Sequence, residues 1–125
     1  MTITKVQLFS LPVSDQDRSR DFYVDLLGFE LVADTQMGPD MRWVQVVPPG
    51  SSTAITLVTW FPTMSAGSSK GTVLETDDLD GDVEALKGRG VLIDGEIQEM
   101  PWGRFVSFDD PDGNGIVLQA TAPRA

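Results

Sequence analysis

The chain contains no cysteine and no histidine among its 125 residues. Without cysteine it can form no disulfide, no thiolate nucleophile and no cysteine zinc site. Without histidine it lacks the commonest general base and the commonest ligand for transition metals. Any metal site would therefore have to be built mostly from carboxylate and carbonyl oxygens.

Positive charge is also scarce. Nine Lys and Arg residues stand against nineteen Asp and Glu residues, which gives a formal net charge of −10. The basic residues are scattered along the chain, whereas sequence-independent nucleic-acid binding requires a basic cluster. We therefore expect neither a nucleic acid nor an anionic membrane as a partner. The acidic balance mainly favours solubility, and it would also attract a cationic ligand.

Long apolar runs are missing as well. Residues 1–15 lack the continuous apolar region of a signal peptide, and no run is long enough to span a bilayer. We expect a cytoplasmic protein. The length suits one domain with a single hydrophobic core.

The order of the predicted elements occurs twice along the chain. In the first half, Ser14 is the expected N-cap of a helix and Gly28 occupies the position of a left-handed C-cap. In the second half, Gly90 ends the corresponding helix. Residues 62 positions apart match, as in Asp15 with Asp77, Gly28 with Gly90, and Arg42 with Arg104. The predicted strands are residues 5–13, 29–35, 41–47, 53–60, 71–77, 91–99, 103–109 and 115–120, with helices over 14–28 and 79–90.

This duplication predicts an α+β fold of two βαβββ modules. The N-terminal module spans residues 1–60 and the C-terminal module 71–122, and both belong to one domain over 1–125. The Gly-, Ser- and Pro-rich residues 61–70 are typical of a linker. Because one module can bury only one face of a small sheet, we expect the two to pack together.

Two charged features have a simple interpretation. The acidic segment 75–82 lacks the spacing and the closing Glu of an EF-hand, so a solvated helix N-terminus is favoured over a calcium loop. Arg42 and Arg104 could bind a ligand carboxylate through their guanidinium groups. Pairing with acidic side chains on a neighbouring strand is the favoured interpretation for both.

Three segments together resemble the vicinal oxygen chelate superfamily, which includes glyoxalase I, bleomycin-resistance proteins, fosfomycin-resistance enzymes and extradiol dioxygenases. The resemblance implies paired βαβββ modules that form a curved mixed sheet around a cavity, usually in a homodimer. The segments are LPVSDQDRSRDFYVDLLGFEL (11–31), RWVQVVPPG (42–50) and FDDPDGNGIVL (108–118).

Enzymes of this superfamily hold a divalent metal with four side chains, two from each module. Matching the motifs places these positions at Leu8, Thr56, Gly71 and Val117. Leucine, glycine and valine side chains offer no donor atom, and a lone threonine hydroxyl is a poor ligand for such ions. We therefore expect no metal and no cofactor. Metal-dependent glyoxalase or dioxygenase activity is not expected.

Strand alternation extends these positions to a candidate ligand site that is apolar with a few polar groups, as small-molecule sites usually are. Trp60 and Trp102 border loops and could stack on a planar or cationic ligand, or else belong to the core or an interface. For Trp43, which matches Phe105 in the repeat, the core or an interface is favoured. The candidate residues are Leu8, Ser10, Trp43, Gln45, Thr56, Val58, Trp60, Trp102, Val117 and Gln119.

Two hypotheses about function follow, and the first is preferred. It describes a homodimeric binding protein that sequesters a small aromatic or cationic molecule, as the bleomycin-resistance branch does. The alternative is a metal-independent lyase or isomerase that uses a carboxylate such as Glu75 or Glu99 as base. No pair of acids has an evident acid–base spacing, so no catalytic residue is assigned. A protein that keeps the fold without a small ligand is a third possibility.

Overall fold

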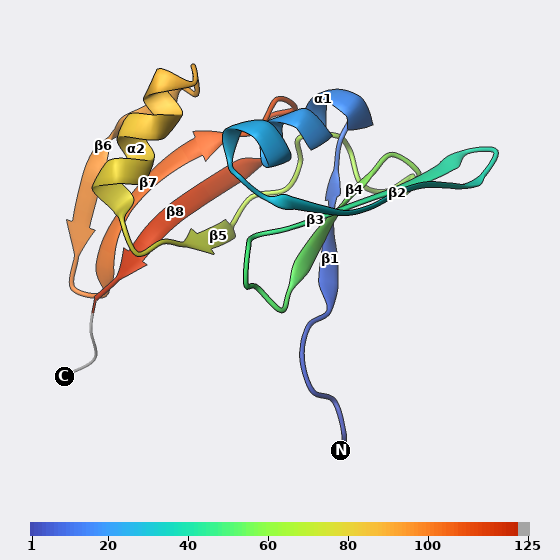
Figure 1. The fold of residues 1–125 in the computed structure, drawn as a ribbon, viewed down its shortest axis with the longest axis horizontal. Coiled ribbons are helices and arrows are strands. Elements are labelled where there is room, and N and C mark those ends of the chain that lie inside the picture. The colour runs from blue at the N-terminus through green and yellow to red at the C-terminus, as the bar shows by residue number, and fades with distance from the viewer. Residues whose placement is uncertain (123–125) are drawn as a thin grey trace.

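The computed structural model of the chain describes residues 1–122 and contains two four-stranded sheets, one for each half of the sequence (Figure 1). The first half contains β1 (Leu8–Pro12), α1 (Gln16–Asp21), η1 (Phe22–Leu26), β2 (Glu30–Gly38), β3 (Met41–Val47) and β4 (Ala54–Val58). The second half contains β5 (Thr72–Glu75), α2 (Leu79–Gly88), β6 (Ile93–Met100), β7 (Gly103–Asp109) and β8 (Gly115–Thr121).

The two sheets have the same topology. Their strand orders are β1-β4-β3-β2 and β5-β8-β7-β6. In each sheet the first strand lies parallel to the last strand of its module, and the other pairings are antiparallel. The registers also correspond. Gln45 on β3 pairs with Thr56 on β4, and Ser107, at the equivalent position of β7, pairs with Val117 on β8. The predicted α+β fold of paired βαβββ units is confirmed.

The strand predicted over residues 5–13 was too long at its start. Strand β1 begins only at Leu8, which pairs with Ala54, the first residue of β4. Before it, the Gln7 carbonyl accepts from the Ala54 backbone N–H at 2.9 Å and the Val6 carbonyl from the Thr53 hydroxyl at 2.8 Å, but no strand pairing continues. The N-terminal segment instead extends away from the sheet, and Ile3 and Val6 are exposed (Figure 1).

The first helix differs from its prediction in two ways. Its N-cap is Asp15, whose carboxylate accepts a hydrogen bond from the Arg18 backbone N–H. Ser14, the predicted cap, donates from its hydroxyl to Asp112 of the other module instead. After Asp21 the helix widens into the π-helix η1, in which Leu27 N–H donates to the Phe22 carbonyl five residues earlier. Two consecutive aromatic residues of this turn, Phe22 and Tyr23, are both buried.

The core lies on the helix side of both sheets. Phe22 packs against Phe108 of the second module, with ring centroids 6.5 Å apart. Alternate strand residues such as Leu57 and Val106 point into this core and are almost completely buried. The intervening residues therefore lie on the opposite face of each sheet, which we call the open face.

A buried polar network joins the two modules at the Asp110–Asn114 turn. Asp110 accepts hydrogen bonds from the Tyr23 hydroxyl (2.9 Å), from the Asn114 side chain (2.8 Å) and from the Asn114 backbone N–H (2.9 Å). Asn114 also donates to the Pro12 carbonyl at 2.9 Å. Burial, together with the neighbouring Asp110 charge, raises the pKa of Tyr23 above its ordinary value. The turn therefore ties the second module to η1 and β1 of the first.

The favoured interpretation of the two arginines is confirmed. Arg42 forms ion pairs with Asp34 on the neighbouring strand and with Asp17, both at 2.8 Å. Arg104 pairs with Asp80 at 3.0 Å and with Glu99 at 3.3 Å. Neither guanidinium is thus held free for a ligand.

The Asp34 carboxylate gives a pH-dependent contribution to stability. Hydrogen bonds from Arg42, and then from Arg20, lower the pKa of Asp34 from 3.8 to about 2. A carboxylate with a lowered pKa stabilises the fold above its unfolded pKa, and this contribution is lost as the pH falls towards the folded pKa. We expect Asp34→Asn to destabilise the protein at pH 7, with the difference from wild type shrinking between about pH 4 and 2.

Urea unfolding at a series of pH values measures this difference. Asp40→Asn is a suitable control, because Asp40 is exposed in the neighbouring β2–β3 turn. A stability difference for Asp34→Asn that stays constant from pH 7 to pH 2 would contradict the ion-pair assignment.

Candidate functional site

The open face of the N-terminal sheet carries an aromatic pair. Trp43 on β3 stacks on Trp60, which follows β4, with ring centroids 6.2 Å apart and an interplanar angle of 27°. The Trp43 indole N–H donates to Gln45 Oε1 at 3.0 Å, which fixes both side chains. Both indoles are only half-buried, and Trp43 is not among the residues of the core. The core part of the favoured interpretation, core or interface, is therefore wrong for Trp43, and the interface part stays a prediction. The pair is therefore available as a stacking surface.

Two hydroxyl groups face each other on the same sheet, and one of them, that of Thr56, stands at a position predicted for a metal ligand. Ser10 on β1 lies opposite Thr56 on β4, and their hydroxyl oxygens are 3.0 Å apart. Thr56 and Val58 are almost completely buried in the single chain, whereas Leu8 and Ser10 are partly exposed. On this sheet, direct contact with a ligand would thus fall mainly to Ser10, Trp43, Gln45 and Trp60.

The open face of the C-terminal sheet is less aromatic. Val117 on β8 lies between Val73 and Ser107 of the adjacent strands, and Gln119 lies between Glu75 and Phe105. Trp102 precedes β7 and is 57% exposed. Phe105 occupies the position that Trp43 has in the first module.

The single chain does not join these two open faces. Within residues 1–122, no hydrogen bond or aromatic contact connects the candidate residues of one sheet with those of the other. Strands β1 and β5 are both outer strands of their sheets, so each sheet has an unpaired edge beside its candidate residues.

The residues present do not fit a metal of the glyoxalase kind. Leu8, Gly71 and Val117 have no donor atom, and the Thr56 hydroxyl is engaged with Ser10. In the part of the chain that the structure describes, no three acidic side chains gather in a way that could hold a metal ion.

We expect treatment with a chelator to leave the thermal unfolding midpoint of the protein unchanged, because a ligand that does not bind the native state cannot stabilise it. Differential scanning calorimetry before and after EDTA treatment measures this. A midpoint that falls on chelation and returns when Zn²⁺ or Mg²⁺ is added would contradict the expectation.

The two carboxylates considered as bases are both accessible to solvent. Glu75 accepts hydrogen bonds from the Thr121 backbone N–H at 3.1 Å and from the Thr121 hydroxyl. Glu99 pairs with Arg104, and its side chain is 77% exposed. A carboxylate usually becomes a base near neutral pH through burial, and neither Glu75 nor Glu99 is buried.

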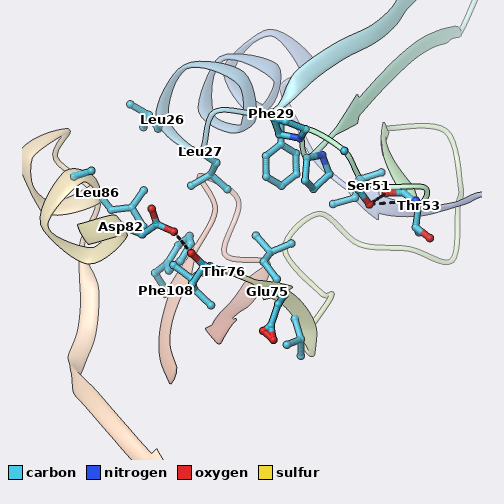
Figure 2. A pocket seen from close by; sticks show the side chains of 18 of the residues that line it. Leu26, Leu27, Phe29, Ser51, Thr53, Glu75, Thr76, Asp82, Leu86 and Phe108 are labelled. Atoms are coloured by element: carbon cyan, nitrogen blue, oxygen red, sulfur yellow. Dashed lines mark hydrogen bonds between the residues drawn. The ribbon is translucent and has the colours of Figure 1, made fainter. Parts of the chain in front are cut away.

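A cavity that the sequence did not indicate lies between the two modules. Figure 2 shows Leu26 and Leu27 of the first module near Leu86 and Phe108 of the second, with Phe29 and Ser51 across the cavity. None of the ten candidate ligand residues lines it. No pattern along the chain marks this cavity, because it arises from the packing of one module on the other.

No helix within residues 1–122 is both long and apolar enough to cross a membrane.

The family model of the glyoxalase/bleomycin resistance protein/dioxygenase superfamily matches residues 5–118. Among curated proteins, the uncharacterized protein YetH of Bacillus subtilis (strain 168) is 36% identical over 120 residues, which cover 94% of this chain and 98% of YetH.

Two solved structures are close to the chain in both sequence and fold. TnmS3, an antibiotic binding protein from Streptomyces sp. CB03234, is 52% identical with a TM-score of 0.92, and the match covers 98% of this chain and 99% of TnmS3. A member of the same superfamily from Sphaerobacter thermophilus DSM 20745 is 40% identical with a TM-score of 0.89, covering 96% of this chain and 99% of that one.

Proposed function

Because the chain belongs to the glyoxalase/bleomycin resistance protein/dioxygenase superfamily, we propose that it is a metal-independent binding protein for a small aromatic or cationic antibiotic. The observation that carries the proposal is the stacked pair Trp43 and Trp60 on the open face of the N-terminal sheet. The 52% identity with TnmS3, an antibiotic binding protein, supports the same ligand class.

The side chains around the pair suit such a ligand. Flat indole faces attract planar rings and cations through their π electrons. Gln45 accepts from Trp43 through its oxygen, so its amide N–H₂ remains able to donate to a ligand. The net charge of −10 favours the approach of a cation.

The proposal includes a homodimer in the cytoplasm. We propose that the chain is one domain of two modules, residues 1–60 and 71–122, joined by residues 61–70. A second copy would place its C-terminal open face, with Trp102, Val117 and Gln119, opposite the Trp43–Trp60 pair. The unpaired edges of β1 and β5 leave room for this pairing.

The experiment that tests binding against turnover is equilibrium dialysis of chelator-treated protein with bleomycin and with the anthracycline daunorubicin. The retained compound is then recovered and analysed by chromatography. Retention of unchanged compound is the result that the proposal predicts. Conversion of the compound, abolished in Glu75→Gln or Glu99→Gln, would overturn it in favour of a metal-independent enzyme.

A further inference from the structure

The cavity between the modules has the size of a small-molecule site. Its volume is about 630 Å³, within the range of typical ligand pockets, which is roughly 300–1,000 Å³. Residues from both modules line it, so a bound molecule would contact the end of η1, the β3–β4 loop, β5 and α2 at once. It is separate from the open face that carries Trp43 and Trp60.

The walls of the cavity are mostly apolar. Phe9, Phe29 and Ile55 contribute from the first module, and Leu86, Phe108 and Leu118 from the second. Phe9 is 38% exposed although it lies on a strand, so part of its ring faces the cavity without a protein partner. Removing such apolar surface from water favours the binding of a ligand with an apolar body.

The charged groups of the cavity are mainly acidic. Glu75 and Asp82 both line it, against the single positive charge of Arg89. Arg89 is engaged, because its Nη1 donates to the Leu26 carbonyl at 2.8 Å. Asp82 Oδ2 accepts a hydrogen bond from the Thr76 hydroxyl at the cavity wall (Figure 2). A carboxylate has two oxygens with about four acceptor sites, so Asp82 can accept further hydrogen bonds.

We propose that this inter-module cavity is a second binding site, which takes an amphipathic amine. The apolar body of the ligand packs among the Phe9, Phe29 and Phe108 rings. Its ammonium group lies at the Asp82 carboxylate, where charge-assisted hydrogen bonds are stronger than neutral ones. Because both modules form the walls, binding there also stabilises the packing of the modules on each other.

A fluorescence titration with dansylcadaverine tests this site, because its dansyl ring brightens in an apolar environment and its chain ends in an ammonium group. We expect saturable enhancement, and at least tenfold weaker binding of dansylamide, which has the same ring without the ammonium. Asp82→Asn should weaken dansylcadaverine binding about tenfold, the size of effect that charged hydrogen bonds give. Glu84→Gln, a neighbouring charge change outside the cavity, should leave it unchanged.

A variant that fills the cavity provides a second test of the site. Ala85 lines the cavity from an exposed position of α2, so Ala85→Phe should block binding while the helix folds. Glu84→Phe introduces the same ring outside the cavity and should bind as wild type does. Unchanged dansylcadaverine binding in Ala85→Phe would overturn the proposal. Since no tryptophan lines the cavity, Trp60→Ala should not affect it, and failure of antibiotic binding at the open face leaves this test intact.

Discussion

Replacing Asp110 by alanine is expected to lower the free energy of unfolding by about 3–5 kcal/mol, because it leaves several donors of a buried network without their acceptor. Asp110 is 4% exposed and is the common acceptor of a network that includes Tyr23 and Asn114. Without it, the Tyr23 hydroxyl and the backbone N–H groups of Asp112 and Asn114 lose their acceptor in a buried place. Each unsatisfied buried donor costs about 1–3 kcal/mol.

Urea unfolding followed by circular dichroism measures the effect of Asp110→Ala. Asp109→Ala is the matched control, because Asp109 is the neighbouring residue and is exposed. Tyr23→Phe removes only one hydrogen bond and is expected to cost about 1 kcal/mol. Equal stabilities of Asp110→Ala and Asp109→Ala would show that the turn does not join the modules.

The second large effect is on binding. Trp60→Ala is expected to weaken daunorubicin binding at least tenfold, or about 1.4 kcal/mol, because aromatic anchors carry a large part of an interface's energy. Trp43→Ala should have a similar effect and should also release Gln45 from its hydrogen bond. The two substitutions are not expected to be additive, because the indoles are in contact with each other.

Isothermal titration calorimetry of chelator-treated protein measures these affinities. Met37→Ala is the control, since Met37 is an apolar side chain on β2 that is 63% exposed and is no candidate ligand residue. Trp102→Ala tests the second module: weaker binding would place Trp102 in the same site as the Trp43–Trp60 pair. Wild-type affinity in both Trp43→Ala and Trp60→Ala would exclude the open face as the site.

Local pattern was enough to predict the fold. The alternation of apolar residues, the turn glycines and the duplication located every strand and both helices, and the superfamily resemblance agrees with the match to residues 5–118. These features depend on neighbours along the chain. The errors were at element ends, where longer-range contacts decide. Asp15 caps α1 because Ser14 bonds to Asp112, which is far away in the sequence.

The candidate site was harder to predict from local sequence pattern than the fold was. Alternation correctly placed Trp43 and Gln45 on one face, but it could not show that Trp60 stacks on Trp43 from beyond the end of β4. The sequence of the Asp110 turn is that of an ordinary hairpin, and the turn is buried only because η1 of the other module packs on it. The inter-module cavity has the same origin in packing between distant segments.

The most direct test of metal-free binding at the open face is a tryptophan-fluorescence titration of chelator-treated protein with bleomycin and daunorubicin. Free N-acetyltryptophanamide, titrated in parallel, corrects for light absorbed by the compounds. Binding at the open face predicts saturable quenching by at least one of them at micromolar concentration, with most of the signal lost in Trp60→Ala. A response no greater than that of the free indole for both compounds would contradict it.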